Sequence, residues 1–283
     1  MPKRSGVKGS LRGRAEDEPP LPEQAWPQFN YSITDAMPLA HCDVGITPAS
    51  IRAMYNVSQG TSAVSHNELG IFEDIGDIYS QEDLDEFFRT LQPRIPQGTH
   101  PILNSVDGGT APTTVAGAGP ESNLDFQISY PIIWPQNSVL FQTDDPVYEA
   151  DYTFLGFFNN LLDAIDGSYC SYTSDGITGN SPGLDPQYPN SAPGGYKGPL
   201  QCGVYKPTNV ISLSYGFQEA NLPPNYLRRQ CNEYMKLGEI GPANSRRTLM
   251  LTSTQDCKAF RLSWPLETVA SQVIPVTVTQ TAA

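Results

Sequence analysis

Two carboxylates four residues apart are the residues in this sequence best suited to chemistry: Glu121 and Asp125, in the segment Glu-Ser-Asn-Leu-Asp. In a helix this spacing puts both side chains on one face, one turn apart. A buried pair of this kind shares a proton and titrates as a unit, which suits a base that works in the acid range. The spacing leaves a second interpretation open, in which both acids simply favour the positive N-terminal end of the helix.

Other kinds of chemistry find little support. The five cysteines show no CxxC spacing and the three histidines form no HExxH motif, so we expect no metal site. A formal charge of −13 repels a phosphate backbone, so we expect no nucleic-acid partner. No run of about 18 apolar residues occurs, so we expect no membrane partner. The first residues lack the apolar core of a secretory signal peptide.

The elements that would position the pair alternate between strand and helix. We expect helices over 49–55, 81–91, 157–165 and 225–237, and strands over 69–72 and 210–215. A further helix, which carries the pair, begins at 119–120 and should end at Pro131, because a proline ring cannot continue the hydrogen-bond ladder. The alternation predicts an α/β fold with a parallel sheet covered by helices on both faces.

The chain divides into an N-terminal extension and one large domain. Residues 1–38 are basic, then acidic and rich in proline, with almost no apolar periodicity, which is typical of a disordered or processing segment. The stretches 97–119 and 167–200 are rich in Gly and Pro, and we expect the second to be a long loop.

Several separate blocks resemble, in the same order, the sedolisin family of serine-carboxyl peptidases, which includes tripeptidyl-peptidases. The segment 119–133 around the pair resembles the catalytic helix of that family. Leu-Gly-Ile-Phe-Glu at 69–73, the block 195–202 and Val-Ile-Ser-Leu-Ser-Tyr-Gly at 210–216 resemble its fungal secreted members. The resemblance covers about residues 39–238.

The resemblance implies a subtilisin-like α/β fold and hydrolysis of peptide or protein substrates. A serine would attack the peptide carbonyl, Glu121 would accept its proton, and Asp125 would orient and support Glu121. Near pH 4 a histidine is protonated, whereas a carboxylate can still accept a proton. The family also implies a secreted monomer, a removable prodomain, and a calcium site whose ligands are absent from this chain.

Two further residues of the family's site find no match in this sequence. The nucleophilic serine belongs downstream of the carboxylate helix in a Ser-Gly-Thr-Ser context, and an oxyanion-hole aspartic acid belongs in Ala-Ser-Gly-Asp-Ser-Gly. The segment 60–63, Gly-Thr-Ser-Ala, imitates the first motif but precedes the helix, so we interpret Ser62 as a loop residue. Similar fungal sequences often have a cysteine at Ser50 as the partner of Cys42.

The resemblance to the family ends at Glu239. It reappears further along when the coding sequence is read in a shifted frame. Residues 267–270 can be encoded by codons that, read in a shifted frame, encode Gly-Asp-Ser-Gly. The codons for Gly238 and Gln255 can likewise contain the donor and acceptor signals of an intron. We therefore expect 239–283 to be a retained intron followed by an out-of-frame exon. This hypothesis predicts a sheet that is incomplete on its C-terminal side, poor solubility and no peptidase activity. A non-catalytic secreted scaffold is the alternative function.

Overall fold

The computed structural model describes most of the chain between residues 42 and 252. The described residues are 42, 45–151, 156–170, 184–216, 219–239 and 249–252. The extension predicted over 1–38 lies outside them, as does most of the segment 239–283.

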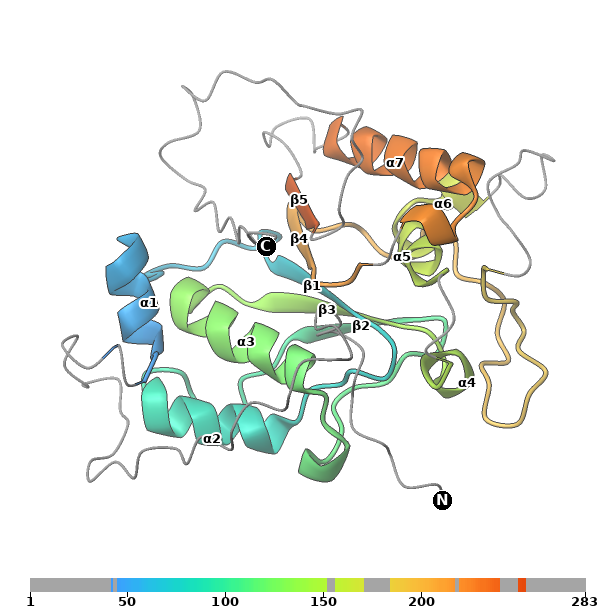
Figure 1. Ribbon diagram of the computed structural model, residues 1–283. Helices are drawn as coiled ribbons and strands as arrows, with labels where there is room; N and C mark the ends of the chain where they lie inside the picture. The colour runs from blue at the N-terminus through green and yellow to red at the C-terminus, as the bar shows by residue number, and fades with distance from the viewer. Residues whose placement is uncertain are drawn as a thin grey trace, which may run out of the picture.

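Five parallel strands form one sheet in the order β2-β3-β1-β4-β5 (Figure 1). Their bounds are β1 Leu69–Glu73, β2 Ile102–Val106, β3 Ser138–Thr143, β4 Val210–Leu213 and β5 Leu249–Thr252. The central strand β1 places Leu69 opposite Ser138 of β3 and Val210 of β4. β5 falls within the segment 239–283. The sheet confirms the predicted α/β class.

Helices cover both faces of this sheet (Figure 1). α1, α2 and α3 lie on one side, and α5 and α7 lie on the other. The helix bounds are α1 Pro48–Tyr55, α2 Gln81–Leu91, α3 Pro120–Ile133, α4 Pro146–Glu149, α5 Phe157–Ile165, α6 Gly167–Cys170 and α7 Pro224–Glu239, with short 3₁₀ helices at Val115–Gly117 and Glu219–Asn221. The predicted helices over 49–55, 81–91, 157–165 and 225–237 are confirmed.

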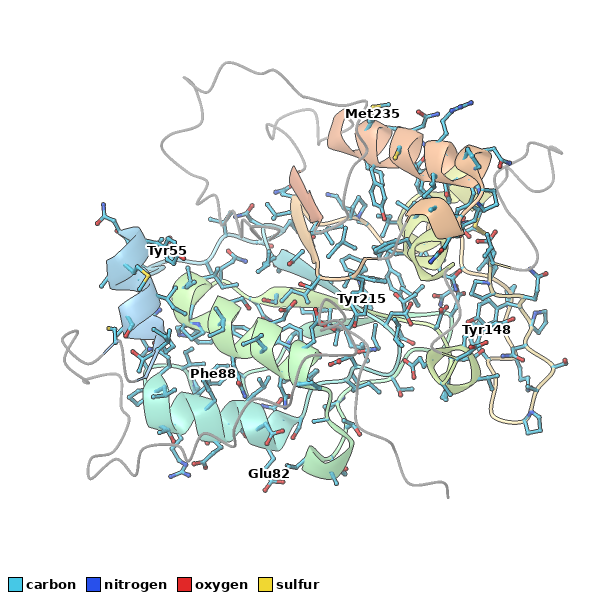
Figure 2. The ribbon with its side chains drawn as sticks, viewed as in Figure 1. Tyr55, Glu82, Phe88, Tyr148, Tyr215 and Met235 are labelled. Atoms are coloured by element: carbon cyan, nitrogen blue, oxygen red, sulfur yellow. A yellow bond between two sulfur atoms is a disulfide. The ribbon has the colours of Figure 1, made fainter. Side chains whose placement is uncertain are left out.

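Successive residues of β1 point to opposite faces and enter two separate cores. Under α2 and α3, Ile71 packs with Leu84, Phe88, Phe126, Tyr130 and Leu140, and Phe88 lies between the two helices (Figure 2). Under α5 and α7, Phe72 packs with Phe141, Phe158, Leu161, Ile211 and Leu237. The two cores hold α3 on one face of the sheet independently of α7 on the other.

The prediction that Pro131 ends the α3 helix is wrong. α3 continues to Ile133, and Trp134 closes its last turn by donating its N–H to Tyr130 O at 2.9 Å. Pro131 lies in the last turn and is buried, so its ring removes one ladder bond while packing against the sheet holds the helix. The sequence analysis also missed β2 and β3, and β4 ends at Leu213, two residues earlier than predicted.

A disulfide bond closes the long segment that follows α5. Cys170 and Cys202 are joined, with their Cα atoms 5.7 Å apart. The predicted loop over 167–200 begins with the short helix α6, and its described part returns to the sheet, where Asp107 and Gln201 exchange hydrogen bonds at 2.8 and 3.0 Å.

Candidate active site

The first two turns of α3 carry both predicted carboxylates. The helix begins at Pro120, where the missing N–H costs no hydrogen bond, directly after Gly119. Glu121 and Asp125 follow one turn apart and share a face. α3 connects the end of β2 to the start of β3, so its first turn lies at the carboxyl edge of the sheet.

The turn that leaves β1 is joined to the start of α3. Gly119 donates its N–H to Ile78 O at 2.9 Å, and Ser122 donates its N–H to Asp77 Oδ1 at 2.9 Å. A third carboxylate, from Asp77, therefore lies against the helix end that carries the pair.

Burial and mutual repulsion keep protons on these acids. Burial, then Asp125, then Asp77 raise the pKa of Glu121 to about 7. Burial and Asp77 raise the pKa of Asp125 to about 6, although hydrogen bonding with the Ser214 side chain acts in the opposite direction. The Oδ2 atom of Asp125 is buried and has no hydrogen-bond partner among the described residues. Both carboxyl groups therefore lose their protons above the usual carboxyl range.

A fully buried acid lies behind the pair at the end of β1. Burial raises the pKa of Glu73 well above its ordinary value, and Asp125 and Asp77 raise it further. Tyr215, which follows β4 and lies in the interior (Figure 2), donates its hydroxyl hydrogen to Glu73 Oε2 at 2.9 Å. The sequence analysis gave no role to Glu73, Asp77 or Tyr215. The available signal was their position at or just after the carboxyl ends of the buried strands β1 and β4.

These groups form a site for accepting and holding protons. One member of the pair can take a proton while its neighbour stays neutral, which avoids two adjacent buried charges. In this structure Glu121 keeps its own proton until near neutral pH. The proton affinity of the site is thus higher than that of an ordinary carboxylate near pH 4.

Ser62 lies away from the pair. Gly60, two residues before it, donates its N–H to Ile132 O at 2.8 Å. Ile132 belongs to the last turn of α3, whereas Glu121 belongs to the first. The geometry agrees with the interpretation of Ser62 as a loop residue.

Three further aspartates at the carboxyl edge hold the chain segment that the Cys170–Cys202 disulfide encloses. Asp107 accepts a hydrogen bond from Gln201 N–H, and Asp144 accepts one from Tyr188. Asp145 accepts hydrogen bonds from the Asn190 side chain and from the N–H of Tyr196. These acids have protein partners and anchor chain segments beside the site.

The described residues offer little for other chemistry. Among them, no group of three or more His, Cys, Asp or Glu side chains is arranged to hold a metal ion. His66 and His100 are exposed in loops, and His41 lies outside the described residues. No helix in the described ranges is both long and apolar enough to cross a membrane.

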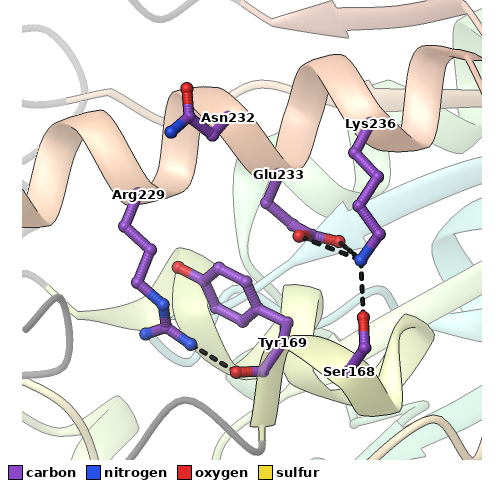
Figure 3. A pocket seen from close by; sticks show the side chains of 6 residues that line it. All are labelled: Ser168, Tyr169, Arg229, Asn232, Glu233 and Lys236. Carbon is purple, nitrogen blue, oxygen red and sulfur yellow. Dashed lines mark hydrogen bonds and ion pairs between the residues drawn. The ribbon is translucent and has the colours of Figure 1, made fainter. Parts of the chain in front are cut away.

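A hollow of about 160 Å³ lies between α6 and α7, at a different place from the pair (Figure 3). Its wall is lined by Ser168, Tyr169, Arg229, Asn232, Glu233 and Lys236. Lys236 donates hydrogen bonds to Ser168 Oγ and Glu233, and the Arg229 guanidinium lies 3.6 Å from the Tyr169 ring centroid. These contacts join α6 to α7, and no residue of α3 takes part.

Comparison with known proteins found three similar fungal proteins. Over 200 residues the chain is 66% identical to the tripeptidyl-peptidase sed1 of Aspergillus fumigatus, covering 71% of this chain and 30% of that protein. Over 240 residues it is 50% identical to aorsin of Aspergillus oryzae, covering 84% and 36%. Over 220 residues it is 36% identical to the tripeptidyl-peptidase SED1 of Arthroderma otae, covering 75% and 30%. The chain spans about a third of the length of these relatives. No family model and no solved structure matches it.

The parallel sheet flanked by helices and these similarities place the chain in the class of α/β proteins with a subtilisin-like fold. Within that class its sequence is similar to fungal peptidases of the sedolisin family, as the resemblance in sequence predicts.

Proposed function

We propose that this chain supplies the carboxylate half of the active site of a secreted acid peptidase that cleaves peptides or proteins. The observation that carries the proposal is the partly buried pair Glu121 and Asp125 beside the carboxyl edge of the sheet, in a chain that is 66% identical over 200 residues to a tripeptidyl-peptidase. Two of the three relatives carry that name, which favours release of tripeptides over internal cleavage.

In this proposal Glu121 acts as general base and Asp125 supports it. A serine hydroxyl attacks the peptide carbonyl carbon and passes its proton to Glu121. Glu121 returns the proton to the leaving amine, and water then hydrolyses the acyl-enzyme by the same route. A hydroxyl that donates a hydrogen bond to the ionised carboxylate favours that form, so the nucleophile lowers the pKa of Glu121 into the acid range.

We place the nucleophilic serine and the oxyanion-hole aspartic acid in sequence outside these 283 residues. The frame shift that recovers Gly-Asp-Ser-Gly over 267–270 supports this placement, and with it the interpretation of 239–283 as intron and out-of-frame exon. Under this proposal the chain itself hydrolyses no peptide. The prodomain, the calcium site and a monomeric state come with the family and are proposed for the whole protein.

The experiment compares two polypeptides on a tripeptide-releasing substrate at about pH 4. One is the 283-residue chain, and the other continues from Gly238 in the recovered frame through the downstream codons, which are first read from the spliced transcript. We expect hydrolysis by the second only. Absence of the splice junction from the transcript, or hydrolysis by the 283-residue chain, would overturn the placement of the missing residues. A junction followed by codons without a serine in the expected context would favour the non-catalytic scaffold.

A further inference from the structure

The helix that carries the pair has no N-cap of its own. The first N–H groups of a helix have no partner within the helix and need acceptors from elsewhere. The residue at the cap position is Gly119, which has no side chain to offer. Asp77 provides an acceptor instead, because its Oδ1 atom accepts the N–H of Ser122 at 2.9 Å. The cap of α3 therefore comes from a residue 45 positions earlier than Ser122.

Gly119 and the turn after β1 allow Asp77 to lie against the start of α3. A Cβ atom on Gly119 would lie 1.9 Å from Asp77 Oδ1 and 2.7 Å from Asp77 Cα, so only glycine fits there. The turn that delivers Asp77 places Ile75 at φ 55° and Gly76 at φ 68°. A β-branched residue in the left-handed region is a genuine outlier, and such strain persists where the surroundings impose it.

The carboxylate of Asp77 also faces the pair electrostatically. It raises the pKa of Glu121, of Asp125 and of buried Glu73. Around these acids, the Tyr215 hydroxyl after β4 donates to Glu73 and accepts the N–H of Asp74, and Asp83 of α2 accepts a hydrogen bond from the Asn123 amide of α3. No Lys or Arg is among the groups that shift these three acids.

We propose that Asp77 is a positioning residue for the pair, which holds the first turn of α3 with its carboxylate and keeps a third acidic group facing Glu121 and Asp125. The inference deepens the proposed function, on which it rests for the catalytic meaning of the pair. The Asp77 side chain thus has two effects: it caps α3, and its charge raises the proton affinity of Glu121 and Asp125. A purely structural cap would do only the first.

The test measures the titration midpoint of Glu121 in the 283-residue chain by carbon-13 NMR of its side-chain carboxyl. Asp77→Asn keeps an acceptor oxygen but removes the charge, so we expect the midpoint to fall by about one pH unit while thermal stability changes little. Asp77→Ala removes both, and we expect the same direction of shift together with a lower melting temperature. Gly119→Ala leaves the charge in the chain but displaces it, and should resemble Asp77→Ala.

The matched control is Glu82→Gln, which removes the same charge from an exposed position in the first turn of α2 (Figure 2). It should leave the Glu121 midpoint unchanged. An unchanged midpoint in Asp77→Asn, or an equal shift in the control, would overturn the proposal. This readout requires no hydrolysis, so it separates failure of the Asp77 inference from failure of the proposed peptidase function.

Discussion

Tyr215 joins the ends of two neighbouring strands through a single hydroxyl. It donates to Glu73 Oε2 at 2.9 Å and accepts the N–H of Asp74 at 3.0 Å. Glu73 is the last residue of β1, Asp74 follows it, and Tyr215 follows β4. The contact therefore fixes the buried acid that lies directly behind the carboxylate pair.

We predict that Tyr215→Phe lowers the free energy of unfolding by about 1–3 kcal/mol, because it leaves buried polar groups of Glu73 and Asp74 without a partner. Urea denaturation at about pH 4 measures this change. Tyr55→Phe is the matched control, since Tyr55 is 69% exposed on α1, and it should change stability by less than about 0.5 kcal/mol. Equal effects of the two substitutions would contradict the role given to Tyr215.

The fold should be more stable in acid than at neutral pH. Burial first, with help from acidic neighbours, raises the pKa of Asp107 to about 7 and of Asp163 to about 8, and raises that of Glu73 strongly. A carboxyl with a raised folded pKa contributes stability that is full below its unfolded pKa, near 4, and is lost as pH rises through the folded value. We predict that the urea midpoint falls between about pH 4 and pH 8, and a rising midpoint would contradict this.

Asp166 should make the fold less stable again at the lowest pH values. Burial tends to raise its pKa, but hydrogen bonds from Lys236 and Ser168 outweigh burial and lower it to about 2. Its contribution is present above the unfolded pKa and is lost as pH falls through the folded value. The urea midpoint should therefore pass through a maximum near pH 4 and decline again below about pH 3.

Ser50→Cys should create a disulfide bond. Cys42 is a free thiol, and its Sγ lies 2.7 Å from Ser50 Oγ. Closing the loop from 42 to 50 should stabilise the protein by about 2–3 kcal/mol. Thiol titration and the melting temperature with and without reductant measure the bond. Ser50→Ala should show no gain, and two titratable thiols in oxidised Ser50→Cys would contradict the prediction.

The elements predicted most accurately are those specified by neighbouring residues in the sequence, through apolar spacing and a capping residue. α2 repeats apolar residues at Leu84 and Phe88 and is capped by Ser80, whose side chain accepts the N–H of Asp83 at 3.2 Å, so its bounds match the prediction. β2 lies at the edge of the sheet and exposes Ile102 and Leu103, so it shows no apolar alternation and was missed. Local rules also failed at Pro131, where packing outweighed the loss of one hydrogen bond.

The candidate site was predictable only in the part contained in one helix. The four-residue spacing of Glu121 and Asp125 is a property of α3 and could be seen in the sequence. Glu73 at the end of β1 and Asp77 in the turn after it come more than 40 residues earlier, and the pairing of β1 beside β3 brings them to the pair. The raised proton affinity of the site could not be predicted, since it follows from burial between these distant segments.

The most direct test of the account is the pH profile of kcat/KM for the frame-restored protein with Glu121→Gln, beside Glu82→Gln as control. We predict that hydrolysis in the acid range falls about 10²–10⁴-fold in Glu121→Gln and is unchanged in Glu82→Gln. Undiminished hydrolysis by Glu121→Gln would contradict the assignment of Glu121 as the proton acceptor.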